Sequence, residues 1–376
     1  MNDFSAARAW RNPTTERVET GVGKVAALPK LLKRCGATRI VLATSNSVRT
    51  KTPNVDRVLA TLTDLEVHVF ADCRQHSPES DIVALARIVD DFRADAVVSI
   101  GGSSIFDTVK IACSRSANAE GVSPIPQIAI PTTLSAGEFT FGAGYTEEET
   151  RTKKLVLDQR AAPRYVILDP LVTLDTPMEL WLSSGIKALD HALEAVWAIK
   201  PHPFADALAL EAIRLFFTHL PRCRDQTDVE ARAACQFAAW LAITAAGGAG
   251  MRLSHFLGHQ IGARLHIPHG ITSCILLPSV MRHLRPQTLD AQCRIAQAMG
   301  VDDEGIDAEE LASRAADRLE AFIGELGLPN TVGQAGADSE DIEAITSASF
   351  DAARELGLAA DLPEGAASIR RILTGS

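Results

Sequence analysis

Imidazole and guanidinium side chains in the second half of the chain have the spacing of one helix face. His255 and His259 are four residues apart, so a helix would carry them on the same side, and Arg252 stands three residues before His255. His269 follows a proline in the next segment. Neutral imidazole binds divalent metal ions, and it also accepts and releases protons near neutral pH. A single histidine is usually an ordinary surface or core residue, but this set predicts a metal site.

A second stretch, GIKALDHALE, contributes a lysine and another histidine. Lys187 and His191 are one helical turn apart. Three or four histidines from two helices could therefore be ligands of zinc or iron. The alternative for Lys187 is an ordinary helix residue, with Asp190 as a partner or in solvent.

A glycine-rich segment in the first half could bind phosphate. Gly101, Gly102, Ser103, Ser104 and Asp107 lie in GGSSIFDTVK, directly after the apolar run AVVSI. Glycines let the backbone approach a pyrophosphate, and the helix that follows directs free N–H groups toward it. The segment is neither the GxGxxG fingerprint nor a Walker loop, so a tight strand-to-helix turn remains the alternative.

Hydroxyl-bearing residues follow two other apolar runs. Thr132, Thr133, Ser135 and Glu138 come after QIAIP, and Ser45 ends the run RIVLATS. Open parallel sheets bind ligands at the carboxyl ends of their strands. A carboxylate at the position of Ser45 would bind a ribose hydroxyl and repel a 2′-phosphate, so the neutral serine permits either NAD or NADP. The alternative is a solvated loop with a helix cap at Ser135.

These segments require a parallel sheet to position them. Short β-branched runs alternate with helical stretches such as 25–34 and 81–92, which predicts helices on both faces of the sheet. We therefore expect an α/β nucleotide-binding domain over residues 1–175. Its predicted strands are Arg39–Ala43, Glu66–Phe70, Ala96–Ile100, Gln127–Ile130 and Tyr165–Leu168.

Strand patterns disappear after residue 170. Thr176, Pro177 and Glu179 predict a helix start with a hydroxyl cap, a proline in the first turn and an acidic residue. Ser339 predicts another helix start. The remainder is rich in alanine and leucine, so we expect an all-α C-terminal domain over residues 176–376.

Composition excludes several classes of protein. The 376 residues are 46% hydrophobic and carry a net charge of −10, which argues against nucleic-acid binding and against anionic membranes. No apolar stretch reaches about 18 residues, and the first residues lack a signal core, so neither a membrane span nor secretion is expected. The seven cysteines form no CxxC pair, which predicts reduced thiols in a cytoplasmic protein.

Taken together, these motifs resemble the iron-containing (group III) alcohol dehydrogenase family over nearly the whole chain. The family shows a GGGSxxD…K loop, a PTTxGTGSE-like loop, a GMDAxxHxxE helix and an HxxxHxLG…PHG segment. Here they are GGSSIFDTVK, PTTLSAGEFT, GIKALDHALE and HFLGHQIG…IPHG. The resemblance implies a Rossmann-like domain with an all-α catalytic domain, as in dehydroquinate synthase, together with NAD(H) or NADP(H) and a homodimer.

The family's metal site consists of an aspartate and three histidines. By resemblance the histidines are His191, His255 and His269, while Lys187 stands at the aspartate position. His259 matches the additional histidine that the family assigns to proton relay. At an effective dielectric constant near 20, an ammonium about 4 Å from a dication costs roughly 8 kcal/mol. The substitution therefore argues against catalytic iron.

A second departure, the length of one loop, resembles the maleylacetate reductase branch of the family. PTTLSAGEFT is one residue shorter than the usual loop, and that branch also tends to lack both the metal-binding aspartate and a charged ribose selector. Lys187 and Ser45 match those traits. The lysine that precedes Asp169 in the family's nucleotide site corresponds to Lys153, with Lys154 as the alternative alignment.

The resulting hypothesis is an NAD(P)H-dependent reductase of an oxo acid or an unsaturated oxo-dicarboxylate. Lys187 would stabilise the developing negative charge, Arg252 would hold a substrate carboxylate, and His259 would relay the proton. Reduction of C=C or of C=O is left open. One alternative is a metal-dependent (iron or zinc) alcohol dehydrogenase, and a second is a catalytically inactive nucleotide-binding protein. A lyase of the dehydroquinate synthase type shares the broad architecture, but its further metal-site and phosphate-binding residues are not apparent in this sequence.

Overall fold

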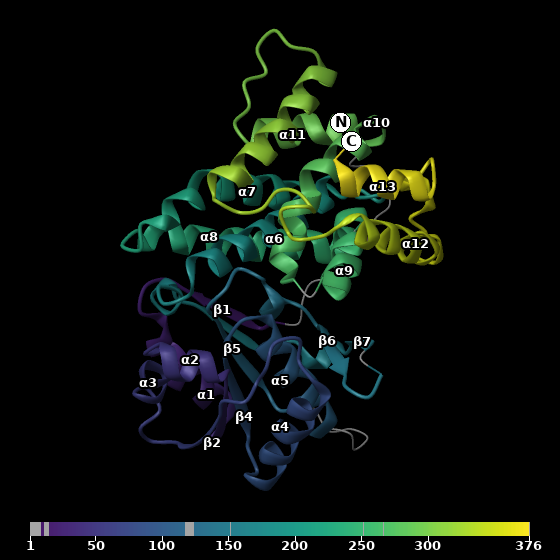
Figure 1. Ribbon diagram of the computed structural model, residues 1–376. Coiled ribbons are helices and arrows are strands. Elements are labelled where there is room, and N and C mark those ends of the chain that lie inside the picture. The colour runs from purple at the N-terminus through teal and green to yellow at the C-terminus, as the bar shows by residue number, and fades with distance from the viewer. Residues whose placement is uncertain are drawn as a thin grey trace. The chain divides into compact units, whose positions relative to one another are not determined.

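The computed structural model describes residues 9–10, 15–116, 124–150, 152–250, 252–265 and 267–375 (Figure 1). The chain divides into two compact units. The sheet unit contains residues 15–176 and 226–236, and the helical unit contains residues 9–10, Pro177–Asp225 and the chain from Phe237 onward. Trp10 belongs to the helical unit, where its ring lies 5.0 Å from that of His202.

The sheet unit is built on six parallel strands in the order β1-β8-β5-β4-β2-β3. The five predicted strands are all present, and β1 at the sheet edge was not predicted. Pairing β2 with both β3 and β4 requires crossover connections, which the intervening helices supply. The strands are β1 (Arg17–Thr20), β2 (Arg39–Ala43), β3 (Glu66–Phe70), β4 (Ala96–Gly101), β5 (Gln127–Pro131) and β8 (Tyr165–Leu168).

Helices cover both faces of this sheet (Figure 1). Ile40 and Leu42 of β2 pack in one apolar cluster with α1 and α3, whereas Val41 and Ala43 pack in another with α4 and α5. This alternation follows from the two-residue period of a strand and confirms the predicted α/β architecture. The helices are α1 (Leu28–Cys35), α2 (Asn46–Lys51), α3 (Asn54–Leu59), α4 (Glu79–Asp91) and α5 (Ser103–Ser116).

A two-stranded antiparallel hairpin, which the sequence did not predict, forms a separate sheet in this unit. It consists of β6 (Gly142–Glu147) and β7 (Thr152–Leu157). Most side chains of β7 are exposed, including Leu155 and Leu157. Because β7 lacks a buried face, its sequence has no apolar alternation to indicate a strand.

The helical unit contains no strand in the portion of the chain that is described, in agreement with the prediction. Its helices are α6 (Met178–Val196), α7 (Pro203–His219), α8 (Val229–Ala249), α9 (Leu253–Leu265), α10 (His269–Ala298), α11 (Ala308–Glu325), α12 (Ser339–Glu355) and α13 (Ala366–Thr374). Fifteen residues of α6 are buried. This helix is therefore a central element of the unit rather than a surface helix.

Two helix starts show how local chemistry sets the boundaries. Pro177 is the N-cap of α6, and the Thr176 hydroxyl donates to the carbonyl of Thr132 at 2.7 Å instead of capping the helix as predicted. The α12 helix begins at Ser339 as predicted. Its cap is Asp338, which forms a capping box with Asp341.

The first part of α8 belongs to the sheet unit, which a single boundary near residue 175 does not describe. Arg232 is fully buried and donates to the carbonyl of Thr173 at 2.6 Å. A buried guanidinium needs such acceptors, so this contact attaches the segment to the sheet unit.

Among the described residues, no helix taken singly has the length and apolar composition of a membrane span. The bent pair formed by α8 and Leu253–Gly262 has that length and composition only when its two helices are counted together.

Candidate active site

The glycine-rich turn between β4 and α5 forms a cradle for an anion. Gly101 ends β4 with φ +144°, and a Cβ atom there would lie 2.2 Å from Ile105. At Gly137 a Cβ would lie 2.6 Å from the Ser103 hydroxyl, and at Gly102 it would lie 3.3 Å from the hydroxyl of Thr133. The three glycines therefore let two loops approach each other at the N-terminus of α5. Helix N-termini favour phosphate groups.

Ser103 contributes a buried hydroxyl to this cradle that a ligand could satisfy. Its Oγ atom is shielded from solvent and has no hydrogen-bond partner among the described residues. A buried hydroxyl without a partner is costly, so a phosphate oxygen at this position would satisfy it. The cradle thus fits the pyrophosphate of a dinucleotide.

The other residues predicted on α5 hold neighbouring segments. The Ser104 hydroxyl accepts a hydrogen bond from the His76 amide at 3.1 Å, and Asp107 accepts one from the Gly144 amide at 3.1 Å. Both side chains therefore have partners within the protein, and their predicted contact with the cofactor stays a prediction.

Lys110 ends the glycine-rich motif, and the structure gives it a role that the sequence did not predict. Its ammonium is fully buried and donates to Gly137 O at 2.7 Å, Thr140 Oγ1 at 2.9 Å and Gly142 O at 3.0 Å. Burial lowers its pKa, while nearby Asp107 raises it. The lysine thereby fixes the loop that carries Gly137 and the start of β6 against α5.

The remaining predicted cofactor residues lie at the carboxyl ends of β2 and β5 or on the hairpin. Thr133 and Ser135 share a hydroxyl hydrogen bond of 2.7 Å, and Ser45 caps α2 by accepting from the Val48 amide at 3.3 Å. Lys154 pairs with Glu147 at 3.7 Å. Thr132 and Glu138 are buried. Lys153 is exposed on β7.

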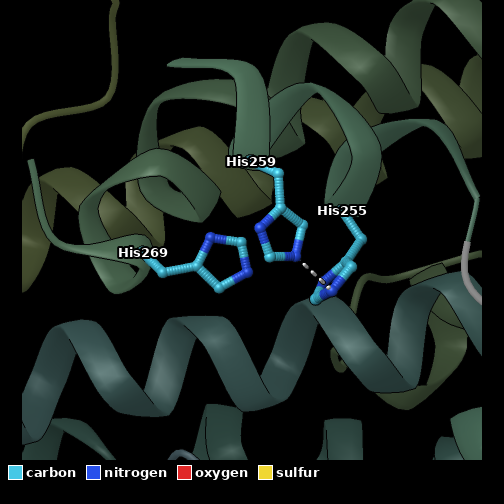
Figure 2. Close-up of side chains that lie close together, drawn as sticks. All are labelled: His255, His259 and His269. Carbon is cyan, nitrogen blue, oxygen red and sulfur yellow. Dashed lines mark hydrogen bonds between the residues drawn. The ribbon is translucent and has the colours of Figure 1, made fainter. Parts of the chain in front are cut away.

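In the helical unit, α9 and α10 bring three imidazoles together (Figure 2). His255 and His259 lie one turn apart on α9, and their Nε2 atoms are 3.1 Å apart. His269 begins α10, and its ring stacks on that of His259 with 4.6 Å between centroids. One ring nitrogen from each residue lies within 4.8 Å of the others. The predicted sharing of a helix face by His255 and His259 is thus confirmed.

The α6 helix adds His191 and Lys187 to this environment. The His191 ring lies 5.7 Å from that of His255, and both of its nitrogens are buried with no partner among the described residues. Burial lowers the pKa of His191 to about 3, and the positive charge of Lys187 acts in the same direction. The pKa values of His255 and His269 are also lowered by burial and by Lys187. The imidazoles of these three residues, His191, His255 and His269, are therefore neutral near pH 7.

Glu194, to which the sequence alone assigned no role, anchors the helix that carries two of the histidines. Its buried carboxylate accepts from the amides of Arg252 and Ser254 at 2.8 Å each and from that of His255 at 3.3 Å. These are N–H groups at the start of α9, which have no partner within the helix. The motif HALE contained the residue, but the amides that it binds lie about sixty positions away. Burial raises the pKa of Glu194 and that of neighbouring Asp190.

The structure gives Arg252 partners within the protein rather than an exposed guanidinium, so its predicted contact with a substrate stays a prediction. Arg252 precedes α9, is buried, and forms a bidentate ion pair with Asp361, with Nε 2.7 Å from Oδ2 and Nη2 on Oδ1. Its other groups donate to the Trp197 carbonyl at 2.7 Å and to Gln287 at 3.2 Å. These contacts use most of the N–H groups of the guanidinium, so they support a structural role for Arg252.

The donor set can be tested against a divalent metal ion. The ring nitrogens that converge belong to His255, His259 and His269, whereas the family set would use His191 in place of His259. Within the described chain this cluster includes no carboxylate, and Lys187 adds positive charge to it. The residues therefore do not fit the aspartate-and-three-histidine site that the resemblance implies.

Comparisons with known proteins agree with the fold and the motifs. Residues 15–170 match the family model described as iron-containing alcohol dehydrogenase, and residues 181–359 match the C-terminal model of the Fe-containing alcohol dehydrogenase family. A maleylacetate reductase from Sphingobium indicum is 31% identical over 319 residues, which cover 85% of this chain and 86% of the relative.

Two further relatives cover even more of the chain. The NAD-dependent methanol dehydrogenase of Bacillus methanolicus is 29% identical over 346 residues, covering 88% of this chain and 91% of that enzyme. The crystal structure of maleylacetate reductase from Rhizobium sp. strain MTP-10005 aligns with a TM-score of 0.82 and 28% identity, covering 98% of this chain and 97% of that one.

Proposed function

The chain belongs to the iron-containing alcohol dehydrogenase family, and from this premise we propose that it is an NAD(P)H-dependent reductase of an oxo acid or an unsaturated oxo-dicarboxylate. The observation that carries the proposal is the convergence of His255, His259 and His269 without a carboxylate among the described residues, with Lys187 at the position of the family's metal-binding aspartate. The similarity to maleylacetate reductases supports the substrate class.

The sheet unit would bind the hydride donor. The cradle formed by Gly101, Gly102 and Gly137 would receive the pyrophosphate, with the Ser103 hydroxyl and the first amides of α5 as donors. Ser45 carries no charge, so the cradle is proposed to accept the cofactor with or without a 2′-phosphate.

The helical unit would stabilise the charge that hydride transfer creates. A bound reduced nicotinamide would supply hydride to the acceptor carbon, and the electron pair of the reduced double bond would then reside on oxygen as an alkoxide or enolate. The ammonium of Lys187 would stabilise that oxygen, as a fixed positive group does in a site shielded from water. His259 is the exposed member of the histidine cluster, so it would deliver a proton to the product and recover one from solvent.

A metal-dependent alcohol dehydrogenase is the second candidate. It is favoured by the convergence of His255, His259 and His269, because three imidazoles with an open fourth position are one form of catalytic zinc site. A bound ion would polarise a carbonyl oxygen. This candidate requires Lys187 to tolerate a neighbouring dication, which Coulomb repulsion disfavours.

Metal analysis and a chelator test separate the two candidates. Purified protein would be assayed for NADH and NADPH oxidation against a panel of oxo acids and aldehydes, before and after dialysis against EDTA. We expect oxidation with unsaturated oxo-dicarboxylates, no stoichiometric metal, and unchanged turnover after EDTA. Stoichiometric iron or zinc, with activity lost on chelation and restored by the metal, would establish the second candidate instead.

A further inference from the structure

The hydrogen bonds around His269 assign its protons. Thr272 lies on α10 within one turn of His269, and its side chain is fully buried. The Thr272 hydroxyl is 2.8 Å from the main-chain carbonyl oxygen of His269 and 3.1 Å from the Nδ1 atom of the same residue. One hydroxyl therefore contacts both the backbone and the ring of the histidine.

A hydroxyl has a single proton, and the carbonyl determines where that proton lies. Two oxygen atoms 2.8 Å apart repel each other unless a proton lies between them, and a carbonyl oxygen has none to give. The Thr272 proton must therefore point to the His269 carbonyl. The hydroxyl oxygen can then only accept at the second contact, so the Nδ1 atom of His269 carries the ring proton.

The opposing helix leaves little space for another arrangement. Gly258 of α9 faces this pair, and a Cβ atom there would lie 3.0 Å from the Thr272 hydroxyl and 3.2 Å from Cε1 of His269. The absence of a side chain at this position lets the two groups approach α9 closely.

We infer that Thr272 is a positioning residue that holds His269 in the Nδ1–H tautomer and leaves its Nε2 atom as a bare acceptor in the active site. The Nε2 atom is buried and has no hydrogen-bond partner among the described residues. Figure 2 shows that this side of the ring is turned toward His255 and His259. A neutral His269 with this tautomer accepts a hydrogen bond there and cannot donate one.

A bare Nε2 atom limits which chemical groups can bind beside His269. A substrate hydroxyl, an ammonium group or a cation satisfies an acceptor, whereas a substrate carboxylate opposes it. If the proposed reductase function holds, the hydroxyl or enol of the product donates a hydrogen bond to the Nε2 atom of His269. The tautomer itself does not depend on that function, because it follows from contacts within the resting protein.

Nitrogen NMR of histidine-labelled protein tests the inference without any substrate. The His269 resonances, assigned by comparison with H269Q, are expected to show a protonated Nδ1 and a bare Nε2. The Thr272→Ser variant keeps the hydroxyl and should give the same pattern. Thr272→Val removes the hydroxyl from a side chain of the same shape and should lose the preference. A protonated Nε2 in the resting wild-type protein would overturn the inference.

Kinetics separates a positioning role from a structural one. Loss of a single hydrogen bond corresponds to a factor of up to about ten in rate, so T272V should lower kcat by about that factor. The KM for the nucleotide and the melting temperature should stay close to the wild-type values, and T272S should restore turnover. Equal kcat in T272V and the wild type would contradict the inference. Should T272V fail to fold, the wild-type spectrum and the T272S variant still decide it.

Discussion

The two units form their functional sites in different ways. The anion cradle of the sheet unit is made from glycines, short hydroxyl side chains and helix amides on two loops, each of which is a short motif at the end of a strand. The histidine cluster of the helical unit is made from long side chains on α9 and α10, and the start of α9 is held by partners far away in sequence. Short motifs can therefore specify the parts of the cradle, whereas the cluster depends on how the helices pack.

The largest effect is expected where the cluster depends on a buried ion pair. Arg252→Met leaves the Asp361 carboxylate buried without its guanidinium, and removing one partner of a buried pair typically costs about 3–5 kcal/mol. The free energy of unfolding in urea should fall by that amount. Arg285→Met, in a half-exposed pair with Glu309 at 3.6 Å, is the control and should change it by less than about 1 kcal/mol. Equal losses in both variants would show that the network around Arg252 does not hold the cluster.

Lys187→Met tests the chemistry assigned to the cluster. Removing a group that stabilises a developing oxyanion lowers kcat by about 10²–10³-fold. The affinity for the nucleotide, measured by fluorescence titration, should not change because the cradle lies in the other unit. The exposed Lys200 offers a control for the loss of one positive charge, and K200M should retain wild-type turnover. Wild-type turnover in K187M would remove the main support for the proposed function.

The neutral histidines also make stability depend on pH. The pKa of His191 falls from about 6.5 to about 3 on folding, so the unfolded chain binds more protons between these values. The contribution to stability is therefore complete above pH 6.5 and decreases as the pH falls toward 3. At pH 5 the loss is roughly 2 kcal/mol for this residue.

His191→Gln isolates this contribution. Unfolding of metal-free protein at pH 7 and pH 5 should show a smaller acid-induced loss in H191Q, by roughly 2 kcal/mol. His68 on β3 is exposed, so H68Q should match the wild-type difference. An unchanged pH dependence in H191Q would contradict the prediction, because it would mean that folding does not lower the pKa of His191.

The smallest effect concerns the cradle. Gly137→Ala places a methyl group 2.6 Å from the Ser103 hydroxyl, so Ser103 must move away from the bound anion. We expect the KM for the nucleotide to rise about tenfold, which corresponds to about 1.4 kcal/mol, with little change in kcat. Gly247 on α8 has no atom within 4 Å of its virtual Cβ, so G247A is the control. A similar KM in both variants would argue against the cradle as the nucleotide site.

The sequence predicted the fold better than it predicted the contacts of the site. Buried parallel strands such as Ala96–Gly101 are continuous apolar runs, so their positions can be found from local sequence. The hairpin strand β7 was missed because an exposed strand has no such pattern. The histidine spacing on α9 was also predictable, since two side chains one turn apart must share a face.

The contacts that the sequence did not reveal join residues that are distant in sequence. Arg252 stands close to His255 in the chain, which suggested a shared role, but its partner Asp361 lies 109 residues further on. The acceptor role of Glu194 likewise depends on amides about sixty residues away. Without the packing of the helices, nothing in either motif distinguishes a buried support from a residue that contacts substrate.

The buried ammonium of Lys110 has a practical consequence for experiments on the intact protein. Amine-reactive reagents modify only lysines that water can reach, and this side chain has no exposed area. Its labelling would therefore occur only when the segment bearing Gly137 detaches from α5. Mass spectrometry of that single amine over time would thus count transient openings around the loop, and a tightly bound dinucleotide should slow them.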